Sequence, residues 1–455
     1  MPANNLTDTI AAVATPTGRG GVGIVRVSGP QAAKIAHSIL GHCPKPRQAE
    51  YLAFNNIEQQ IIDQGIALYF PAPHSFTGED VLELQGHGGP VVMDMLLKSV
   101  IKAGARLARS GEFSERAFLN DKMDLTQAEA IADLIDAGSE QAARSAIRSL
   151  QGVFSEAVHG LVEDVTRLRI FVEASIDFPE EEIDFISEGK VSNQIEAQLQ
   201  TLATISNQAQ QGSLIREGIN LVLVGQPNAG KSSLLNALAQ RDAAIVTEIP
   251  GTTRDIVKEA IMLDGLPVHI LDTAGLRQSE DLVEKEGMRR TWAAVEQADV
   301  MLLIIDNSVG FGEQEHAILK QCPEQIAVIA VINKCDLVSQ HKGKLTERDD
   351  LKSGQLCQIS AKTGEGIDDL ISRIKELAGM QASGEGAFMA RRRHLVALDQ
   401  AQTHLQFALQ QTNQHQGELI AEELKLVQQY LGEITGELSS DDLLGKIFSE
   451  FCIGK

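Results

Sequence analysis

The chain has 455 residues, of which 43% are hydrophobic, and its formal net charge is −22. This length and apolar content predict about two to four domains, each with an ample core. The acidic balance argues against broad, nonspecific coating of nucleic acid, although it leaves room for a local basic site.

Targeting signals and membrane spans are not apparent. No apolar run approaches the ~18 residues of a membrane span, and Met1–Asn5 lacks the charged and apolar regions of a signal peptide. The five cysteines form no C-x-x-C pair. We therefore expect no stable membrane association, no disulfide scaffold or zinc site, and a cytoplasmic protein.

Residues 1–120 consist of short apolar runs punctuated by proline and glycine, which predicts an α+β domain. The β-like runs are 10–14, 24–27, 66–70 and 80–84. Gly18–Gly23 matches G-x-G-x-x-G, but the strand-like Ile24–Val27 follows it where a dinucleotide fold needs a helix. We expect instead a glycine turn that lets a ligand or a neighbouring strand approach.

Residues 121–215 and 379–455 are poor in proline and have helical periodicity. Apolar positions spaced by three and four include Ile420, Leu424, Val427, Leu431, Ile434 and Leu438, and a similar stripe is Leu395, Leu398, Leu405 and Leu409. We expect both stripes to be core, and the two segments to form one all-α domain. The basic cluster Arg391–His394 has two interpretations, a solvated helix start or an RNA contact.

Residues 225–232 read Gly-Gln-Pro-Asn-Ala-Gly-Lys-Ser, a complete phosphate loop. An apolar strand, Ile219–Val224, precedes it and a helical pattern follows, which is the context that this motif requires. Backbone N–H groups and the helix N-terminus would bind a polyphosphate. Lys231 would reach the terminal phosphates and Ser232 would hold Mg²⁺.

The segment Asn333–Asp336 follows an apolar strand and predicts which base the nucleotide carries. The Asp336 carboxylate can accept the two N–H groups of the guanine edge, which adenine lacks, and such sites discriminate by roughly 10⁴–10⁵. Ser360–Lys362 follows another short strand, and its backbone would read the guanine carbonyl.

Two further motifs lie between these. Asp272–Gly275 ends the strand Leu266–Leu271, where Asp272 would support the Mg²⁺ shell and the Gly275 N–H would sense the γ-phosphate. Gly251–Asp255 offers Thr253 as a second Mg²⁺ ligand. The five motifs in this order resemble the translation-factor-related GTPases, and they predict a doubly wound, Ras-like α/β domain over residues 216–378.

Leu276 occupies the position where many GTPases carry the glutamine that orients the attacking water. Another group must supply this function. An arginine finger, worth ~10³–10⁵ in rate, could be Arg254 or Arg277. The alternative is a monovalent cation bound by the side-chain oxygen of Asn228 and by loop oxygens between Thr247 and Thr252.

The C-terminal segment Phe448–Lys455 is either frayed or docked. Phe448, Phe451 and Ile453 are apolar enough to dock, which would bring a thiol and a lysine into a site. Cys452 lies where prenylation motifs place a cysteine, but Gly454 and Lys455 fit that motif badly.

Over its whole length the chain resembles the MnmE (TrmE) family of tRNA uridine-modification GTPases. The segments that carry the resemblance are Ala14–Pro16, Gly18–Gly23, Phe118–Lys122, Ile176–Glu182, the phosphate loop with Asn228, and Cys452–Lys455. The resemblance implies an N-terminal tetrahydrofolate-binding and dimerisation domain at 1–120, helical segments at 121–215 and 379–455, and an inserted GTPase domain at 216–378.

The resemblance also implies the chemistry. A formyl-tetrahydrofolate-type donor would contact Arg26, Glu83, Lys122 and Lys455. A homodimer would work with the FAD- and NADH-using flavoprotein MnmG (GidA) to install an aminomethyl or carboxymethylaminomethyl group on C5 of the tRNA wobble uridine. Cys452 is the position linked to that modification.

For the GTPase, the resemblance implies potassium dependence and activation by dimerisation of the GTPase domains. Asn228, Thr247, Ile249 and Thr252 match the potassium ligands, and Glu284 matches a glutamate that acts through water in place of the missing glutamine. The nucleotide contacts expected from these motifs are Asn228, Ala229, Gly230, Lys231, Ser232, Ser233, Thr247, Glu248, Ile249, Pro250, Gly251, Thr252, Thr253, Asp272, Thr273, Ala274, Gly275, Asn333, Lys334, Cys335, Asp336, Ser360, Ala361 and Lys362.

Two other functions stay open. A ribosome-assembly GTPase of the same superfamily would carry an RNA-binding module or a second GTPase unit, and neither is apparent. A folate-binding regulator with a vestigial GTPase would bind folate but not turn over GTP in potassium, whereas the five intact motifs favour turnover.

Overall fold

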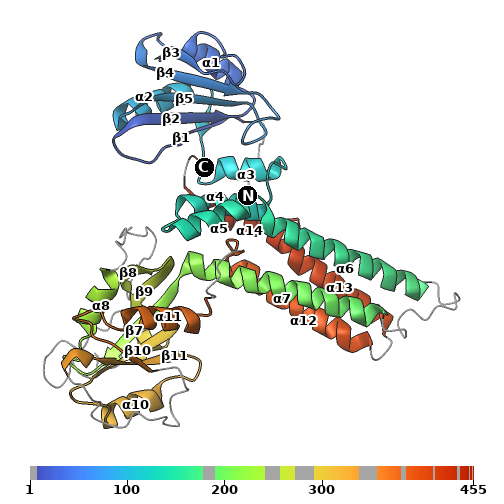
Figure 1. Ribbon diagram of the computed structural model, residues 1–455. Coiled ribbons are helices and arrows are strands. Elements are labelled where there is room, and N and C mark those ends of the chain that lie inside the picture. The colour runs from blue at the N-terminus through green and yellow to red at the C-terminus, as the bar shows by residue number, and fades with distance from the viewer. Residues whose placement is uncertain are drawn as a thin grey trace. The chain divides into compact units, whose positions relative to one another are not determined.

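The computed structural model describes residues 8–177, 190–240, 257–271, 292–337, 356–380, 386–412, 416–437, 441–449, 451, 452 and 454 (Figure 1). The chain divides into two compact units. The first unit is Met1–Ala132, Leu150–Ile170 and Leu424–Lys455, and the second is Asp133–Ser149 and Phe171–Glu423. Within the described residues, no helix has the length and apolar character needed to span a bilayer.

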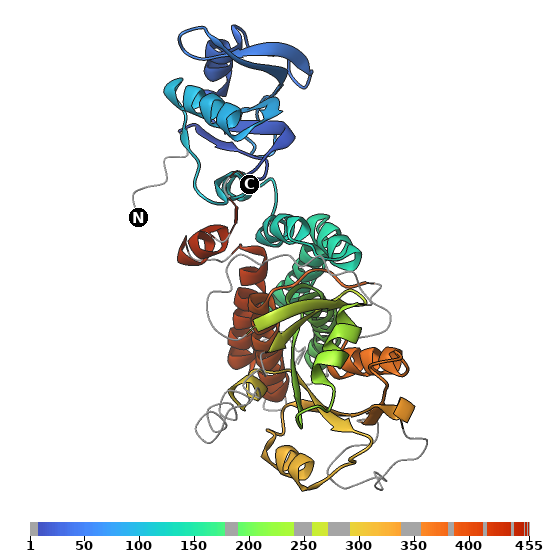
Figure 2. The ribbon, with the colours of Figure 1, turned by 90° about the vertical axis from the view of Figure 1, so that its left-hand side faces the viewer.

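The first unit contains a six-stranded sheet of order β3-β4-β5-β2-β1-β6. Its strands are β1 Ile10–Val13, β2 Gly20–Ser28, β3 Glu50–Asn55, β4 Ile61–Phe70, β5 Val81–Gly88 and β6 Arg106–Leu107. All neighbours are antiparallel except β1 and β6. Helices α1 (Ala32–Leu40) and α2 (Pro90–Lys102) pack their apolar faces into the core of this sheet, and Figure 2 shows α2 lying across the strands. From Leu82 to Gly88, buried residues in β5 alternate with half-buried or exposed ones, as expected for a sheet with one covered face.

The glycines near residue 20 are part of a strand, so the prediction of a glycine turn was only partly right. Gly20 and Gly23 belong to β2 and pair with Gly88 and Gly86 of β5, with an irregular register between them. A Cβ on Gly88 would lie 2.6 Å from the Val22 carbonyl oxygen. The glycines therefore serve the close approach of a neighbouring strand.

Within the described residues, the segments expected to be helical are helical. Their helices are α4 Leu125–Ile135, α5 Glu140–Leu150, α6 Val153–Asp177, α7 Lys190–Glu217, α12 Arg392–Thr412, α13 Gly417–Thr435 and α14 Asp441–Ser449, and α3 Glu112–Leu119 precedes them. In the Ile420–Leu438 stripe all members up to Ile434 are fully buried, and Leu438 lies outside the described residues. In α12, Leu398 and Leu405 are buried, whereas Leu395 and Leu409 are half-buried. The first stripe is thus confirmed as core, and the second is core at its two central positions. In the second unit, α7 packs along α12.

The second unit contains a sheet of order β12-β11-β10-β7-β9-β8, in which all pairs but β8–β9 are parallel. The strands are β7 Ile219–Gly225, β8 Val257–Leu263, β9 Leu266–Leu271, β10 Val300–Asp306, β11 Ala327–Asn333 and β12 Leu356–Gln358. The central strands read as continuous apolar runs because helices cover both faces of such a sheet. Strand β7 lies between β10 and β9, which makes its carboxyl end the topological switch point where ligands bind.

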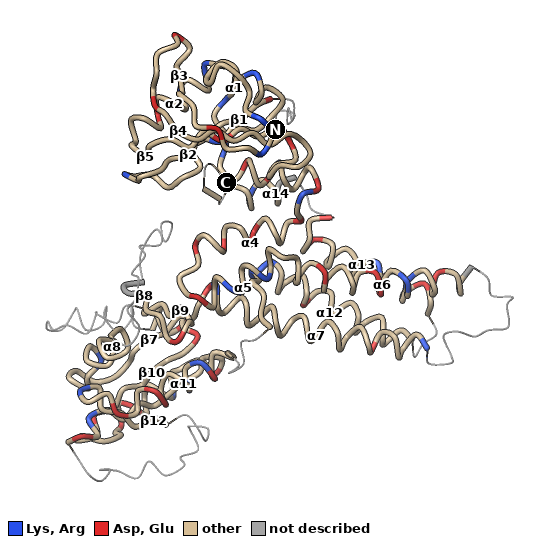
Figure 3. The backbone as a smooth tube through the Cα atoms, turned by 45° about the horizontal axis from the view of Figure 1, so that its top comes forward, with Lys and Arg blue, Asp and Glu red and all other residues tan. Residues whose placement is uncertain are grey.

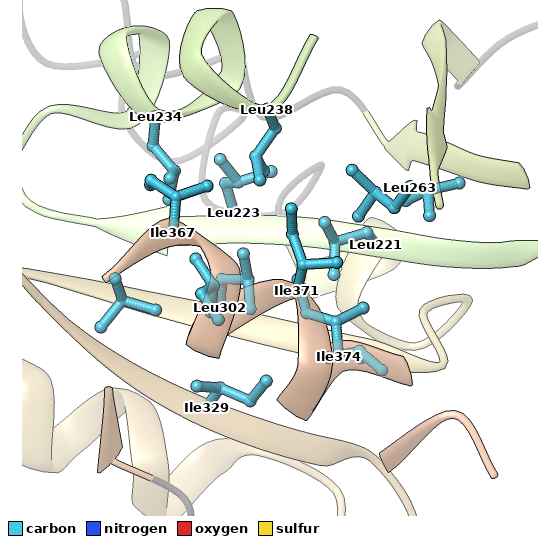
Figure 4. Close-up of a cluster of buried hydrophobic side chains, with 14 of the residues drawn as sticks. Leu221, Leu223, Leu234, Leu238, Leu263, Leu302, Ile329, Ile367, Ile371 and Ile374 are labelled. Atoms are coloured by element: carbon cyan, nitrogen blue, oxygen red, sulfur yellow. The ribbon is translucent and has the colours of Figure 1, made fainter. Parts of the chain in front are cut away.

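One face of this sheet is covered by α8 (Lys231–Ala239) and α11 (Ile367–Leu377). Figure 4 shows Leu234 and Leu238 of α8 and the isoleucines of α11 directed toward Leu221 and Leu223 of β7. A second cluster on the opposite face includes part of α10 (Glu313–Gln321) and residues 294–298. These two cores fix the carboxyl edge of the sheet, where the predicted nucleotide motifs lie.

Candidate functional site: a nucleotide pocket and an N-terminal polar site

The phosphate loop joins β7 to α8 at the carboxyl edge of the second sheet. Gly225 and Gly230 have φ angles of 153° and 100°. A Cβ on Gly230 would lie 2.1 Å from Asn333 Nδ2. An L side chain would therefore be both strained and blocked at that position. Asn228 has φ of 64°, a left-handed conformation that asparagine tolerates better than most residues.

Lys231 begins α8 and is tied to the loop that precedes it. Its Nζ donates to the carbonyl oxygens of Gly225 at 2.7 Å and Gln226 at 2.8 Å. Burial lowers the pKa of the Lys231 ammonium group. Ser232 and Ser233 follow in the first turn of α8, and both are exposed. The predicted phosphate and Mg²⁺ groups of this loop thus lie together at one helix N-terminus.

Asn333 is a buried link between three of the predicted motifs. Its Nδ2 donates to the Ala229 carbonyl at 2.9 Å, and its Oδ1 accepts from the Ala361 N–H at 3.0 Å. One N–H of the amide and its oxygen are thus used inside the protein. The phosphate loop, the Asn333–Asp336 motif and the Ser360–Lys362 motif are therefore held together before any base contact is considered.

The neighbouring Lys334 also contacts the phosphate loop. Its Nζ donates to the Asn228 carbonyl at 2.8 Å and forms an ion pair of 2.6 Å with Asp306 Oδ2. This ammonium group holds the pKa of the Asp306 carboxyl below its usual range, against the opposing effect of burial. The Lys334 ammonium group thus holds the Asn228 backbone, whose side-chain oxygen is the predicted cation ligand.

Asp336 is exposed, and its carboxylate is oriented by the base-reading loop. Its Oδ1 accepts a hydrogen bond of 2.7 Å from Ser360 Oγ. The neighbouring Cys335 N–H donates to the Ile359 carbonyl at 3.2 Å. Burial raises the pKa of the Cys335 thiol. An oriented carboxylate at this edge can accept the paired N–H groups of guanine.

Several predicted residues lie outside the described part of the chain. These are Thr247, Glu248, Ile249, Pro250, Gly251, Thr252, Thr253, Arg254, Asp272, Thr273, Ala274, Gly275, Leu276, Arg277, Glu284 and Lys455. Their sequence neighbours β8 and β9 are described, and β9 ends at Leu271, immediately before Asp272.

In the first unit, Arg26 and Glu83 are cross-strand neighbours on β2 and β5. Arg26 Nε and Glu83 Oε1 form an ion pair of 3.0 Å. The guanidinium also lies 5.4 Å and 5.7 Å from the ring centroids of Phe76 and Phe113, a cation–π geometry. Lys122 is placed separately, with its Nζ donating to the Pro73 carbonyl at 3.0 Å.

The C-terminal segment is docked on the first unit. Phe448 and Phe451 are buried, with ring centroids 5.5 Å apart. Gly454 has φ of 95°, and a Cβ there would lie 2.4 Å from the Val13 carbonyl oxygen at the end of β1. Cys452 is exposed between these anchors, and its carbonyl accepts from the Gly111 N–H at 3.4 Å. Of the two interpretations of this segment, the structure favours docking.

The basic cluster Arg391–His394 is used partly inside the helical segment. Arg391 Nη2 forms an ion pair of 2.9 Å with Asp133 Oδ1, and the buried His394 Nδ1 accepts from the Arg391 N–H at 3.0 Å. Figure 3 shows Lys and Arg scattered among Asp and Glu along the described helices. Arg391 and His394 are thus engaged within the helical segment, whereas Arg392 is exposed, and the RNA contact stays a prediction.

Two residues that contact the phosphate loop or its neighbour Lys334 were not predicted from the sequence. Asp306 ends β10, and the rule that singled out Asp272 at the end of β9 could have found it. Glu315 lies near the N-terminus of α10 and contacts Gln226 of the phosphate loop. Nothing in the sequence distinguishes Glu315 from an ordinary first-turn glutamate.

Two family models match this chain. A family model described as the MnmE helical domain matches residues 125–452, and one described as the GTP-binding protein TrmE N-terminus matches residues 9–122. The chain belongs to the MnmE family. The combination of an α+β N-terminal domain, an all-α domain and an inserted P-loop GTPase domain is the architecture expected from the sequence.

Relatives in the MnmE family match along the full chain. The tRNA modification GTPase MnmE of Yersinia pestis is 57% identical over 455 residues, covering 99% of each chain. The protein of the same name from Erwinia tasmaniensis is 56% identical over 462 residues, covering 99% of this chain and 100% of the relative. Among solved structures, Era in complex with MgGDPNP and 16S ribosomal RNA is 27% identical, covering 41% of this chain and 66% of that chain, with a TM-score of 0.29.

Proposed function

We propose that this chain is a GTP hydrolase that acts in tRNA modification. The observation that carries the proposal is the convergence of three nucleotide motifs on Asn333, which contacts Ala229 and Ala361. The full-length identity of 57% with a protein named tRNA modification GTPase MnmE supports the second half of the proposal.

Different described residues would contact different parts of GTP. Lys231 neutralises the terminal phosphates, Asn333–Lys334 brace the loop, and Asp336 accepts the guanine N–H groups. Ser232, with Thr253, would hold Mg²⁺, which when bound neutralises charge on the β- and γ-phosphates. The exposed Ser232 hydroxyl at a helix N-terminus fits this assignment.

Hydrolysis is proposed to depend on potassium, because Leu276 cannot orient water. The resemblance to the MnmE family adds the proposal that dimerisation of the GTPase domains activates it. Asn228, Thr247, Ile249 and Thr252 would hold K⁺, which when bound adds positive charge where the transition state gains negative charge. Glu284 would orient the attacking water through a second water. The side-chain oxygen of Asn228 fits a cation because the left-handed backbone and Lys334 fix this residue in place.

Potassium dependence is tested by GTP turnover in KCl and NaCl at equal ionic strength. We expect at least ~10-fold faster turnover in KCl, and loss of that difference in Asn228→Ala with nucleotide binding retained. Equal rates in the two salts for the unmodified protein would contradict the cation assignment and point back to an arginine finger.

The N-terminal domain is proposed to bind a formyl-tetrahydrofolate-type donor. The Arg26–Glu83 pair supplies a cation for glutamate carboxylates and an acceptor for pterin N–H groups, and Lys122 and Lys455 would add charge. The protein would act as a homodimer with the flavoprotein MnmG, whose FAD and NADH supply the redox chemistry, on C5 of the wobble uridine. We assign domains at 1–120, 121–215, 216–378 and 379–455.

The modification function is tested by nucleoside analysis of tRNA from a strain that lacks the gene. We expect the aminomethyl and carboxymethylaminomethyl uridines to disappear and to return with a plasmid copy. Unchanged levels of these nucleosides in the deletion strain would refute the tRNA half of the proposal without touching GTP hydrolysis.

A further inference from the structure

We propose that Glu315 and Gln226 form a contact that positions the phosphate loop, so that Glu315 is a positioning residue for GTP binding. Neither side chain belongs to the predicted nucleotide contacts. This inference rests on the proposed GTP-binding function.

The hydrogen bond between Gln226 and Glu315 is short, and the Glu315 side chain is buried. Glu315 is 1% exposed. Its Oε1 accepts a hydrogen bond of 2.7 Å from Gln226 Nε2, and its Oε2 accepts one of 2.9 Å from the Gly312 N–H at the start of α10. Both carboxylate oxygens thus have donors, which offsets the cost of burying the group. Oε2 thus contacts the start of α10, and Oε1 contacts the phosphate loop.

The loop side of the contact leads directly to the phosphate-binding lysine. Gln226 accepts, through its carbonyl, a hydrogen bond of 2.8 Å from Lys231 Nζ. The later half of the loop is held by Lys334 on Asn228 and by Asn333 on Ala229. Glu315, which lies in α10, holds the first half of the phosphate loop through its hydrogen bond with Gln226.

Electrostatics exclude a direct role in holding phosphate. A carboxylate beside a phosphate loop opposes polyphosphate binding by charge alone. The benefit of Glu315 must therefore lie in the position that it imposes on Gln226 and, through the Gln226 carbonyl, on Lys231. Losing this position should weaken nucleotide binding more than it slows the chemical step.

The experiment exchanges the two side chains in the full-length protein. Gln226→Glu places two carboxylates in contact. Glu315→Gln keeps the acceptor for the Gly312 N–H, and its amide nitrogen can donate to the Gln226 side-chain oxygen after the Gln226 amide rotates, so this variant replaces a charged hydrogen bond by a neutral one. In the double variant, the amide oxygen introduced in α10 would accept from the Gly312 N–H, while the amide nitrogen donates to the carboxylate introduced in the loop. Every donor of the contact then again has an acceptor. The probes are a fluorescent GTP analogue for Kd and steady-state turnover in KCl for KM and kcat.

We expect Gln226→Glu to raise Kd and KM by about tenfold or more, with kcat changed less, because two carboxylates then face each other without a donor. Glu315→Gln, which keeps a neutral hydrogen bond, should raise both constants by a smaller factor. The double variant should return to within about threefold of the unmodified protein. Glu313→Gln, an exposed neighbour in the same helical turn, is the matched control and should change neither constant.

Thermal unfolding of each variant separates positioning from simple stability. Single variants with a lowered Tm but unchanged nucleotide Kd would overturn the inference, because Glu315 would then only cap α10. A double variant no better than the worse single variant would also overturn it. If the unmodified protein bound no GTP, the proposed function itself would fail, an outcome distinct from either of these.

Discussion

Asn333 shows how a single buried side chain can connect the segments of a site. The sequence predicts the Asn333–Asp336 motif as a base reader, and the Asn333 amide contacts the Ala229 carbonyl and the Ala361 N–H. Asp336, the proposed base reader of this motif, accepts a hydrogen bond from Ser360. Residues of one motif therefore have separable tasks, and substitutions can test them separately.

Asp336→Asn should change the base that the pocket prefers. The amide replaces one acceptor by a donor, which opposes the guanine N–H groups but suits the carbonyl that xanthine carries there. We expect GTP affinity to fall by at least ~10²-fold and xanthosine triphosphate to become the better substrate. Competition binding with both nucleotides measures this, and retained preference for GTP would refute the assignment of Asp336.

Glu112 shows a second kind of residue, a buried charge at the centre of an ion-pair network. It is 2% exposed and contacts both Arg106 and Arg116. Burial raises the pKa of the Glu112 carboxyl, but the hydrogen bonds from Arg106 and the Arg109 N–H outweigh this effect and lower it to about 2. Glu112 links α3 to β6, which carries Arg106.

The ion pairs of Glu112 should make the free energy of unfolding depend on pH in the acid range. A depressed pKa contributes stability that is present above the unfolded value near 4.5 and is lost as pH falls toward about 2. Glu112→Gln should lower the free energy of unfolding by up to about 3 kcal/mol at pH 7, and the difference from the unmodified protein should shrink between pH 4.5 and 2. Calorimetry across this range measures it, with exposed Glu58→Gln as control. A difference independent of pH would contradict the ion-pair explanation.

At the scale of elements, packing between helices and segments overrides local propensity. Gly212 lies inside α7, where glycine is a poor helix former, but a Cβ there would lie 1.7 Å from the Phe388 carbonyl oxygen. The segment before α12 thus passes against the backbone of α7, and the glycine permits that approach. Gly160 in α6 has no atom within 4 Å of the same position.

These two glycines make a matched pair of substitutions. Gly160→Ala should stabilise by up to ~1 kcal/mol, because alanine is the better helix former. Gly212→Ala should instead destabilise by ~1–3 kcal/mol, because backbone atoms cannot move aside cheaply. Thermal unfolding of both variants measures the sign of each change. A stabilising Gly212→Ala would show that the approach of the Phe388 carbonyl is not needed.

Prediction from sequence succeeded for elements whose signal is local. The strand that precedes the phosphate loop, the helix that follows it and the buried stripe on α13 were expected from the sequence, and all are found. Strands β3 and β10 were not singled out, and Gly20–Gly23 was expected as a turn although it lies in β2. Glycine favours turns in isolation, and only the neighbouring β5 decides that it serves a strand here.

At the scale of the whole molecule, the C-terminal segment belongs to the same unit as the N-terminal sheet. Phe448 and Phe451 anchor it, Gly454 lies against Val13, and Cys452 is exposed between them. This arrangement brings a thiol to the domain that carries Arg26 and Glu83, although these residues are far apart in the sequence. The modification chemistry proposed for this unit can therefore be tested separately from the GTP hydrolysis proposed for the other.

The docked tail should be needed for modification and not for GTP turnover. Gly454→Ala adds a side chain at a left-handed φ and 2.4 Å from the Val13 carbonyl, so the tail should detach. We expect near-normal GTP turnover with loss of modified wobble uridine, and the same separation for Cys452→Ser. Gly445→Ala, which meets no atom within 4 Å, is the control. Normal modified-uridine levels in both variants would exclude the tail from the chemistry.

The sequence by itself determined the parts encoded in consecutive residues. A phosphate loop needs glycines and a lysine at fixed spacing, and a base-reading motif needs its aspartate beside the end of a strand, so both are legible in one dimension. The tertiary structure alone decided the contacts between distant segments. Gln226 meets Glu315, Arg391 meets Asp133, and Gly454 meets Val13 because folding brings these backbones together, and no local preference of either residue specifies its partner.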